Sequence, residues 1–258
     1  MKLAIISPTK FLIPYTFTDY HLMLAHMSTD YDYMSYYSTV ARGYKILDNS
    51  VIELGRALHP DELEQAIAAL NPHELVLPDT PGSHKDTYEA AQKLGPFFKA
   101  KYPDLKLQVV PQAEDGGSVC FMKSMYKFLQ IPEVDTIGIP KSLKEERLNV
   151  LRLIEADRPT HWDYHLLGTW GNPANELRQV PIDHPWIRGV DSKIPVRLGL
   201  HGIALHPTRG MLIPDENRYE LPEMKFGSDD DPFPYIVTHN ITVMKGWCDG
   251  TQSSVRQL

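Results

Sequence analysis

The sequence predicts an α/β protein, a (β/α)8 TIM-type barrel with a C-terminal extension. Seven short runs rich in Val, Ile and Leu recur along the chain, and segments with helical periodicity separate most of them. Each run is too short for a helix and too continuously apolar for a half-exposed strand, which is typical of strands buried on both faces of a parallel sheet. The residues that end six of these runs are 31, 33, 26, 30 and 23 positions apart, close to the length of one strand–helix unit.

An eighth strand, expected in the irregular stretch over residues 8–44, would complete the eight that close such a barrel. An open doubly wound sheet is the alternative, but neither glycine-rich nucleotide-binding motif of those folds follows the first run. The other expected strands are LAIIS from Leu3, KILDNS from Lys45, ELVLPDT from Glu74, LQVVPQ from Leu107, TIGIPKS from Thr136, HLLGTW from His165 and IRGVDS from Ile187.

Four amphipathic helices are predicted between the runs, over residues 60–70, 83–102, 118–129 and 142–156. Ser83 is the expected cap of the second helix. Ser142 and Glu145 have the spacing of a capping box at the start of the fourth helix. The apolar face of that helix is expected to comprise Leu143, Leu148, Leu151 and Ile154.

Beyond Asp191 the repeating pattern gives way to sequence punctuated by Pro and Gly. An acidic run over 229–231 is more typical of a solvated loop than of a metal site, and an apolar segment follows over 235–247. We therefore expect a barrel catalytic domain over residues 1–200 and an extension over residues 201–258 that packs on it.

The composition describes a globular chain, with 42% hydrophobic and 23% charged residues among 258. No apolar run approaches the roughly 20 residues that span a bilayer, and the first residues are too briefly apolar for a signal peptide, so a cytoplasmic location is expected. Cys120 and Cys248 stand far apart, as expected of reduced thiols. The net charge of −7 argues against holding nucleic acid by bulk electrostatics, so a polyanion would need a local basic face.

Polar residues directly after each apolar run are the first candidates for chemistry, because the loops at the C-terminal ends of the strands build the active site of such barrels. Three carboxylates on one mouth would raise one another's pKa and supply acid, base and nucleophile roles. Each aspartate could instead cap the next helix, and each glycine could only permit a turn. The positions selected are Asp48 with Asn49 and Ser50, Asp79 with Thr80, Gln112, Lys141 with Ser142, the Gly168 to Gly171 turn, and Asp191 with Ser192 and Lys193.

Tyrosines are concentrated in residues 19–44, which hold six of the 13 in the chain. Such a segment could stack a flat ring or a displaced base, or it could form a helix across the barrel mouth. The six are Tyr20, Tyr31, Tyr33, Tyr36, Tyr37 and Tyr44.

The strand ends, read in order, resemble those of the queuine/archaeosine tRNA-guanine transglycosylase superfamily over about residues 1–200. That family has the motifs NTYHL, DSGGFQ, an Asp that ends the next strand, VQGG, a LAVGE-type glycine turn, YLMGVG and GVDMFDCVLPTR. The corresponding segments here are DYHLML from Asp19, LDNSVIEL from Leu47, LPDT from Leu77, VVPQAEDGG from Val109, IGIPKS from Ile137, HLLGTWGNPANEL from His165 and GVDSKIPVR from Gly189.

Two departures bear on this resemblance. The tRNA enzymes carry a Cys/His zinc subdomain, which two isolated cysteines cannot reproduce, so the chain is more similar to the short bacteriophage DNA-guanine transglycosylases, which insert 7-deazaguanines into DNA. A phage enzyme would act in the host cytoplasm. The family's nucleophile is the second Asp of its last motif, a position that Ile194 occupies here, so Asp191 would have to serve in its place.

The resemblance implies a glycosyl-enzyme mechanism with no cofactor and no metal. Asp191 would be the nucleophile and Asp48 the acid/base, although Asp48 is the first alternative for the nucleophile. Asp79 would accept hydrogen bonds from the guanine donors, and Asn49, Gln112, Gly138 and Gly168 would complete the base pocket. The target nucleotide would be flipped out or single-stranded, with Trp170 and the tyrosine-rich segment as candidates to stack on it. The DNA backbone would contact a basic patch drawn from Lys141, Lys144, Lys193, Arg197, His201, His206 and Arg209, unless these residues are only a solvated face.

Three alternatives remain open at this stage. The acceptor polymer could be tRNA, since no clear reader of the 2′-hydroxyl is evident. The barrel could be a metal-independent hydrolase or lyase acting on a small molecule. With Ile194 at the family's nucleophile position, it could also be a catalytically inactive binding barrel.

Overall fold

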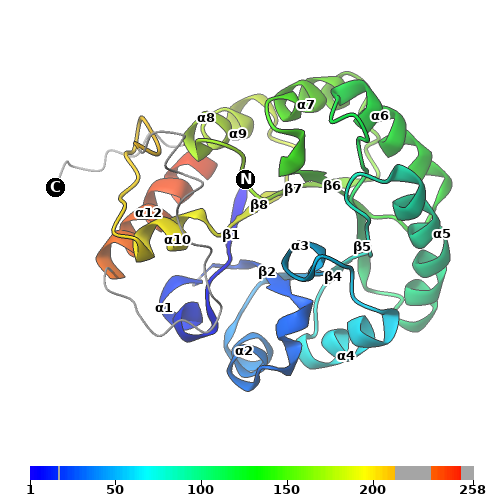
Figure 1. Ribbon diagram of the computed structural model, residues 1–258, viewed down its shortest axis with the longest axis horizontal. Helices are drawn as coiled ribbons and strands as arrows, with labels where there is room; N and C mark the ends of the chain where they lie inside the picture. The colour runs from blue at the N-terminus through cyan, green and yellow to red at the C-terminus, as the bar shows by residue number, and fades with distance from the viewer. Residues whose placement is uncertain (17, 213–233, 251–258) are drawn as a thin grey trace.

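The computed structural model is a (β/α)8 barrel, as predicted, and it describes residues 1–16, 18–212 and 234–250. Eight parallel strands surround the barrel axis in the order β1-β8-β7-β6-β5-β4-β3-β2, and β1 and β2 contact each other, so the ring is nearly closed (Figure 1). The strands are β1 Lys2–Ile5, β2 Tyr20–Leu24, β3 Tyr44–Asp48, β4 Glu74–Val76, β5 Lys106–Val109, β6 Thr136–Pro140, β7 Asp163–Leu167 and β8 Gly189–Ser192.

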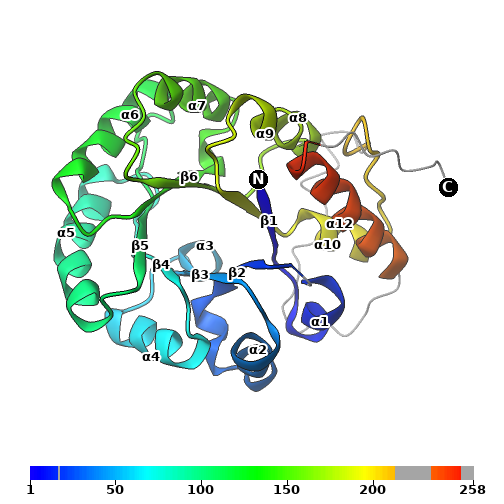
Figure 2. The same cartoon turned by 180° about the vertical axis from the view of Figure 1, so that it is seen from behind.

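Most of the helices cover the outside of the ring, whereas the short α3 lies over its mouth (Figures 1 and 2). They are α1 Leu12–Tyr15, α2 Tyr31–Ser35, α3 Val51–Leu54, α4 Pro60–Leu70, α5 His84–Lys101, α6 Ser118–Lys127, α7 Glu146–Ala156, α8 Pro173–Leu177, α9 Val180–Asp183, α10 Ile194–Leu200 and α12 Pro234–Cys248. Short 3-10 or π turns connect several elements, namely η1 Thr9–Phe11, η2 Ala25–Thr29, η3 Tyr36–Val40, η4 Phe128–Gln130 and η5 Lys141–Leu143.

The seven strands located from apolar runs are confirmed, and β2 is the irregular eighth strand. The helix boundaries follow local signals. Pro60 begins α4 behind the cap of His59, and the backbone amide of Asp86 donates to Ser83 at 3.2 Å, the cap expected for α5.

The capping box predicted at Ser142 and Glu145 is wrong. Ser142 lies in the turn η5, and α7 begins only at Glu146, after Lys144 has turned through a positive φ of 51°. A residue in the left-handed region interrupts a right-handed helix, so the first predicted turn cannot join α7. The later start places Arg147 in the first turn of α7 with its side chain buried.

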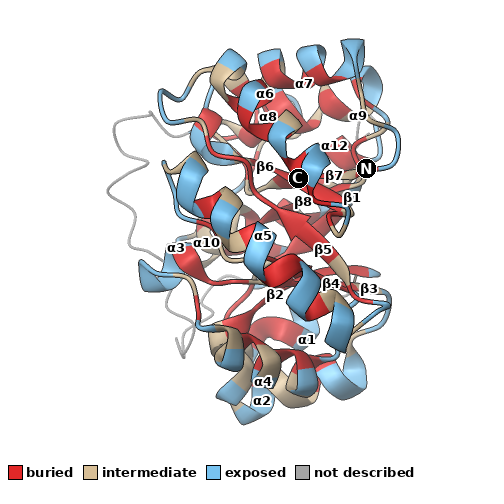
Figure 3. Ribbon diagram, turned by 90° about the vertical axis from the view of Figure 1, so that its right-hand side faces the viewer, coloured by how far each residue is buried: buried red, intermediate tan, exposed pale blue. Residues whose placement is uncertain are grey.

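Alternate residues along each strand point into the barrel or toward the helices. An inner apolar cluster contains Leu22, Ile46, Val76 and Val110, while a larger cluster lies between the strands and the helices. Figure 3 shows the strands almost wholly buried and the outer faces of the helices exposed. Polar side chains also lie inside the ring, among them Tyr20, Glu74, Gln108, Thr136 and His165.

The helix α12 packs on the barrel beside α10, α8 and β1. Its residues Val237, Ile241 and Trp247 belong to the same apolar cluster as Leu3 of β1. The apolar segment predicted over 235–247 therefore covers the barrel wall. The acidic run over 229–231 lies outside the described residues. Within the described ranges, no helix combines the length and the apolar character that a bilayer crossing requires.

Candidate active site

The three predicted carboxylates all lie toward the C-terminal ends of the strands. Asp48 ends β3, Asp191 lies in β8, and Asp79 follows β4 by three residues. In the side view of Figure 3, α3 and α10, which follow β3 and β8, lie toward one end of the barrel, and the N-terminus lies toward the other. The three carboxylates therefore lie at one mouth of the barrel, as their positions after the apolar runs predicted.

Asp79 is buried, and two amide side chains hold it, one at each carboxylate oxygen. Asn49 Nδ2 donates to Oδ1 at 2.8 Å, and Gln112 Nε2 donates to Oδ2 at 2.9 Å. The same Asn49 nitrogen also donates to the carbonyl of Leu77, and the oxygen of Gln112 accepts from the backbone of Gly82. Burial raises the pKa of Asp79 to about 6, and the Asn49 bond opposes that rise. Asn49 and Gln112, predicted to contact the base, orient Asp79 in this structure.

Asp48 has an electrostatic environment that favours its protonated form. Burial raises its pKa well above the usual range, and the nearby charges of Glu53, Asp79 and Asp191 raise it further. The backbone amide of Ser50 donates to Oδ2 at 2.8 Å and opposes this rise. A carboxyl group that keeps its proton to higher pH can act as a general acid.

Asp191 is 5% exposed, and two hydrogen bonds hold one of its oxygens. The backbone amide of Gly168 lies 3.0 Å from Oδ1, and Nε2 of His165 lies 3.2 Å from the same oxygen. Neither bond uses Oδ2. One carboxylate oxygen is thus fixed by the protein, which suits the other to approach an electrophilic carbon.

The turn at Gly168 is fixed from behind by a buried ion pair that the sequence reading missed. Both terminal nitrogens of Arg147 donate to the carbonyl of Gly168 at 2.9 Å. Nε of Arg147 lies 3.1 Å from Oε1 of Glu176, in contact but not aligned as a hydrogen bond. Gly168 has a φ of 66°, so a residue with a side chain would be strained there. Gly168 therefore positions Asp191, and its predicted contact with the base stays a prediction.

Gly138 does not end its strand, as the sequence led us to expect, and its predicted place in the base pocket stays a prediction. It lies in the middle of β6, where it pairs in register with His165 of β7. A Cβ atom there would lie 2.6 Å from Nε2 of Gln108 and 2.8 Å from a methyl group of Leu167. A glycine is required because these side chains approach the strand closely inside the ring.

Several of the predicted basic residues gather around the loop that follows β7. The side chain of Lys141 lies against Gly168, where an added Cβ would meet its Cδ at 2.8 Å. Nζ of Lys144 lies 5.8 Å from the ring centre of Trp170, a cation–π contact. Asn172 of the same loop donates to the carbonyl of Arg209 at 2.7 Å, which holds the Arg209 segment beside it.

The remaining basic candidates have other placements. Lys193 directly follows β8, and Arg197 lies in α10, so both are close in sequence to Asp191. The ring of His206 accepts from the backbone amides of Thr208 and Arg209, each at 3.2 Å, so it serves the turn.

The tyrosine-rich segment neither crosses the mouth nor presents a row of rings to it. Tyr33, Tyr36 and Tyr37 are buried in the core beneath the helices, and α2 lies on the outer wall near α4 (Figure 1). Tyr20 and Tyr44 stack inside the barrel, with ring centres 5.9 Å apart. A buried ring cannot stack on a base, so the predicted stacking role is wrong for Tyr20, Tyr33, Tyr36 and Tyr37. Tyr31 differs from them, with 74% exposure.

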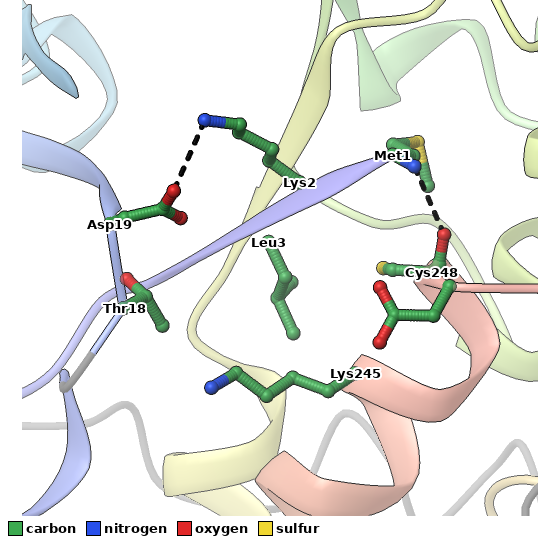
Figure 4. Close-up of a pocket in the computed structure, with 8 residues that line it drawn as sticks. Met1, Lys2, Leu3, Thr18, Asp19, Lys245 and Cys248 are labelled. Atoms are coloured by element: carbon green, nitrogen blue, oxygen red, sulfur yellow. Dashed lines mark hydrogen bonds and ion pairs between the residues drawn. The ribbon is translucent and has the colours of Figure 1, made fainter. Parts of the chain in front are cut away.

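A pocket of about 320 Å³ lies at the N-terminal end of β1, away from the carboxylates (Figure 4). There the amino group of Met1 donates to the carbonyl of Cys248 at 3.1 Å, and Lys2 pairs with Asp19 at 3.3 Å. The ammonium of Lys2 and the carboxylate of Asp19 neutralise each other at its edge. This pocket lacks the convergent carboxylates of the mouth, so we assign it no chemistry.

Comparisons with known proteins leave the family open. No protein-family model matches the chain, and no curated protein matches it significantly. The resemblance to guanine transglycosylases therefore stays a prediction, and the site must be judged on its own geometry.

Proposed function

We propose that this barrel exchanges guanine in DNA for a 7-deazaguanine, such as 7-cyano-7-deazaguanine, through a covalent glycosyl intermediate on Asp191. One observation carries the proposal, namely that three carboxylates converge on one mouth with different environments. Asp191 has one oxygen fixed, Asp48 favours its protonated form, and Asp79 is a buried acceptor held by two amides. These are the nucleophile, the acid and the base-recognition group that such an exchange needs.

In the first step, Oδ2 of Asp191 attacks C1′ of the deoxyribose. The bond from C1′ to N9 breaks, and its electron pair leaves with guanine, which takes the proton of Asp48. The products are a glycosyl ester on Asp191, neutral guanine and an ionised Asp48. The elevated pKa of Asp48 supports this role because the group must carry its proton before the reaction begins.

In the second step, the deazaguanine replaces guanine in the base site. The Asp48 carboxylate takes the proton from its N9–H, N9 attacks C1′, and the ester bond to Asp191 breaks. Asp191 is again a carboxylate and Asp48 is again protonated, so the cycle closes with no change in oxidation state.

Asp79 is suited to recognise guanine and deazaguanine in the same way. Both bases present N1–H and an exocyclic amino group, and an ionised carboxylate offers about four acceptor positions. Asn49 and Gln112 occupy one position on each oxygen, which leaves lone pairs for the base. Because their amide nitrogens already make two hydrogen bonds each, they hold Asp79 in place as the bases change.

An exchange assay with three polymers tests the proposal. The protein is incubated with guanine-containing duplex DNA, single-stranded DNA or tRNA, together with labelled guanine or 7-cyano-7-deazaguanine. We expect label in DNA and none in tRNA. Label in tRNA alone would reassign the acceptor, and label in no polymer would refute base exchange and favour the hydrolase, lyase or inactive-barrel alternatives.

The affinity for the base should depend on pH through Asp79. Its pKa of about 6 means that the carboxylate gains a proton as the pH falls below that value and then loses acceptor positions and charge. We expect the KM for the incoming base to rise below about pH 6, measured from pH 5 to 8. Asn49→Leu should move the rise to higher pH, because the Asn49 bond stabilises the ionised form. An identical pH profile in Asn49→Leu would contradict this role for Asp79.

A further inference from the structure

A chain of hydrogen bonds runs through the interior of the barrel and ends on Asp191. Nδ1 of His165 lies 2.8 Å from the hydroxyl of Tyr20, and Nε of Arg188 lies 3.1 Å from the same hydroxyl. The other ring nitrogen of His165 contacts Oδ1 of Asp191 at 3.2 Å. The histidine is fully buried and the tyrosine is 1% exposed. Side chains from β2, from β7 and from the residue before β8 thus connect to the candidate nucleophile.

One assignment of donors and acceptors satisfies every member of this hydrogen-bond chain. A guanidinium can only donate, so the Tyr20 oxygen accepts from Arg188. In that assignment the Tyr20 hydroxyl donates to Nδ1 of His165, and Nε2 of His165 carries the hydrogen that is donated to Asp191. Burial lowers the pKa of His165, although Asp191 opposes the effect, and burial raises the pKa of Tyr20. A neutral imidazole and an intact phenol fit this pattern.

Arg188 lies at the end of the hydrogen-bond chain farthest from Asp191, and charged side chains hold it there. Arg188 donates to Glu74 at 2.8 Å and to Asp163 at 3.2 Å, and Tyr44 donates to Glu74 at 2.6 Å. Glu74 is completely buried. Two carboxylates therefore fix the guanidinium whose Nε meets Tyr20.

The position of the Tyr20 side chain depends on Gly189, the first residue of β8. A Cβ atom at Gly189 would lie 2.5 Å from Cε1 of Tyr20, so a side chain there would displace the phenol. The backbone thus provides the space that the chain of hydrogen bonds needs.

We propose that Arg188 and Tyr20 fix the Nε2–H tautomer of His165, which in turn holds Oδ1 of Asp191 and directs Oδ2 toward the reacting carbon. All three are positioning residues, and this role rests on the proposed base exchange. In the opposite tautomer, Nε2 would be a lone pair facing a carboxylate oxygen, and the two would repel. The hydrogen bond from His165 also stabilises the Asp191 carboxylate each time the glycosyl ester breaks.

The tautomer can be measured without any activity. In protein labelled with ¹⁵N histidine, long-range ¹⁵N–¹H correlation spectra distinguish the two neutral tautomers and the imidazolium, and His165→Gln assigns the signal. We expect the Nε2–H form at neutral pH, and a mixture with the Nδ1–H form in Tyr20→Phe. An Nδ1–H form or an imidazolium in the wild-type protein would overturn the proposal, and so would an unchanged tautomer in Tyr20→Phe.

Kinetics then test whether the tautomer acts on the reaction. Tyr20→Phe should lower kcat for exchange by about ten- to a hundred-fold and leave the KM for the base unchanged, because Asp79 is untouched. Tyr164→Phe is the matched control, since it removes a hydroxyl from the same strand as His165 but on the face turned away from the barrel axis, where it donates to Pro159. Equal losses in the two variants would mean a merely structural role and would overturn the proposal.

His165 itself offers a rescue test. His165→Phe should lower kcat by about a hundred-fold or more, because it removes a donor to a reacting group. His165→Gln should restore much of that loss, since the glutamine amide can still donate to Asp191. A glutamine variant as slow as the phenylalanine variant would count against the positioning role. If the wild-type protein exchanges no base with any polymer, the proposed function fails. The tautomer measurement still tests whether Arg188 and Tyr20 fix the Nε2–H form of His165.

Discussion

Replacing Asp191 with asparagine is expected to reduce base exchange by about 10⁴-fold or more, because an amide cannot form the glycosyl ester. The substitution preserves size, and its oxygen can still accept from Gly168 and His165, which hold Oδ1 in the native protein. The fold and the binding of DNA should therefore change little. The measurement is label exchange together with mass spectrometry of protein trapped with DNA, in which the adduct mass should disappear.

Asp183→Asn provides a control of the same chemistry at an exposed position in α9, and it should behave as the native protein. Retained turnover in Asp191→Asn would transfer the nucleophile role to another carboxylate, first to Asp48. Asp48→Asn separates the two possibilities, since an enzyme that has lost only its acid should still form the adduct with substrates whose base leaves easily. Loss of the adduct in Asp48→Asn alone would make Asp48 the nucleophile.

The barrel could be predicted because a parallel sheet covered by helices has a strong sequence signal. A strand such as β6 is buried on both faces along most of its length, so its central residues form a continuous apolar run. The strand β2 was placed only within a broad interval because YHLML mixes aromatic and polar residues with apolar ones. The start of α7 was misplaced because Lys144 adopts a positive φ that interrupts the helix, which the local propensity of a lysine does not indicate.

The sequence predicted the carboxylates of the candidate site but not the side chains that orient Asp191. Residues at strand ends share a mouth by topology, so Asp48, Asp79 and Asp191 could be selected from position alone. The side chains that orient Asp191 come instead from inside distant strands, as with Tyr20 and His165, which are 145 residues apart. The available signal was His165 within the apolar run of β7. A buried polar side chain needs a hydrogen-bond partner, so this histidine indicated a polar contact inside the barrel.

Arg147 should contribute more to stability than its position on a helix suggests. It is 1% exposed, pairs with Glu176 and donates two hydrogen bonds to Gly168. Arg147→Met is expected to lower the free energy of unfolding by about 3–5 kcal/mol, because it leaves a buried carboxylate without its cation. Urea unfolding monitored by circular dichroism measures this change.

The loss of stability in Arg147→Met should depend on pH, and this dependence identifies the cause of the loss. Burial already raises the pKa of Glu176, and Arg147 lowers it, so removing the arginine should raise that pKa further. A carboxyl whose folded pKa exceeds its unfolded value binds more protons when folded, so its contribution to stability decreases as the pH rises between the two values. We therefore expect the deficit of Arg147→Met to be smaller at pH 5 than at pH 8. A deficit independent of pH would point to lost side-chain contacts instead of a lone charge.

The double variant Arg147→Met with Glu176→Leu separates stability from function. Replacing both members of a buried ion pair with apolar residues is often neutral, so the double variant should regain most of the stability that Arg147→Met loses. It still lacks the two donors that hold the carbonyl of Gly168, whose amide orients Asp191. A well-folded double variant with slow exchange is therefore expected. Full exchange activity in that variant would show that the Gly168 turn needs no anchor, and a double variant as unstable as the single one would contradict the lone-charge explanation.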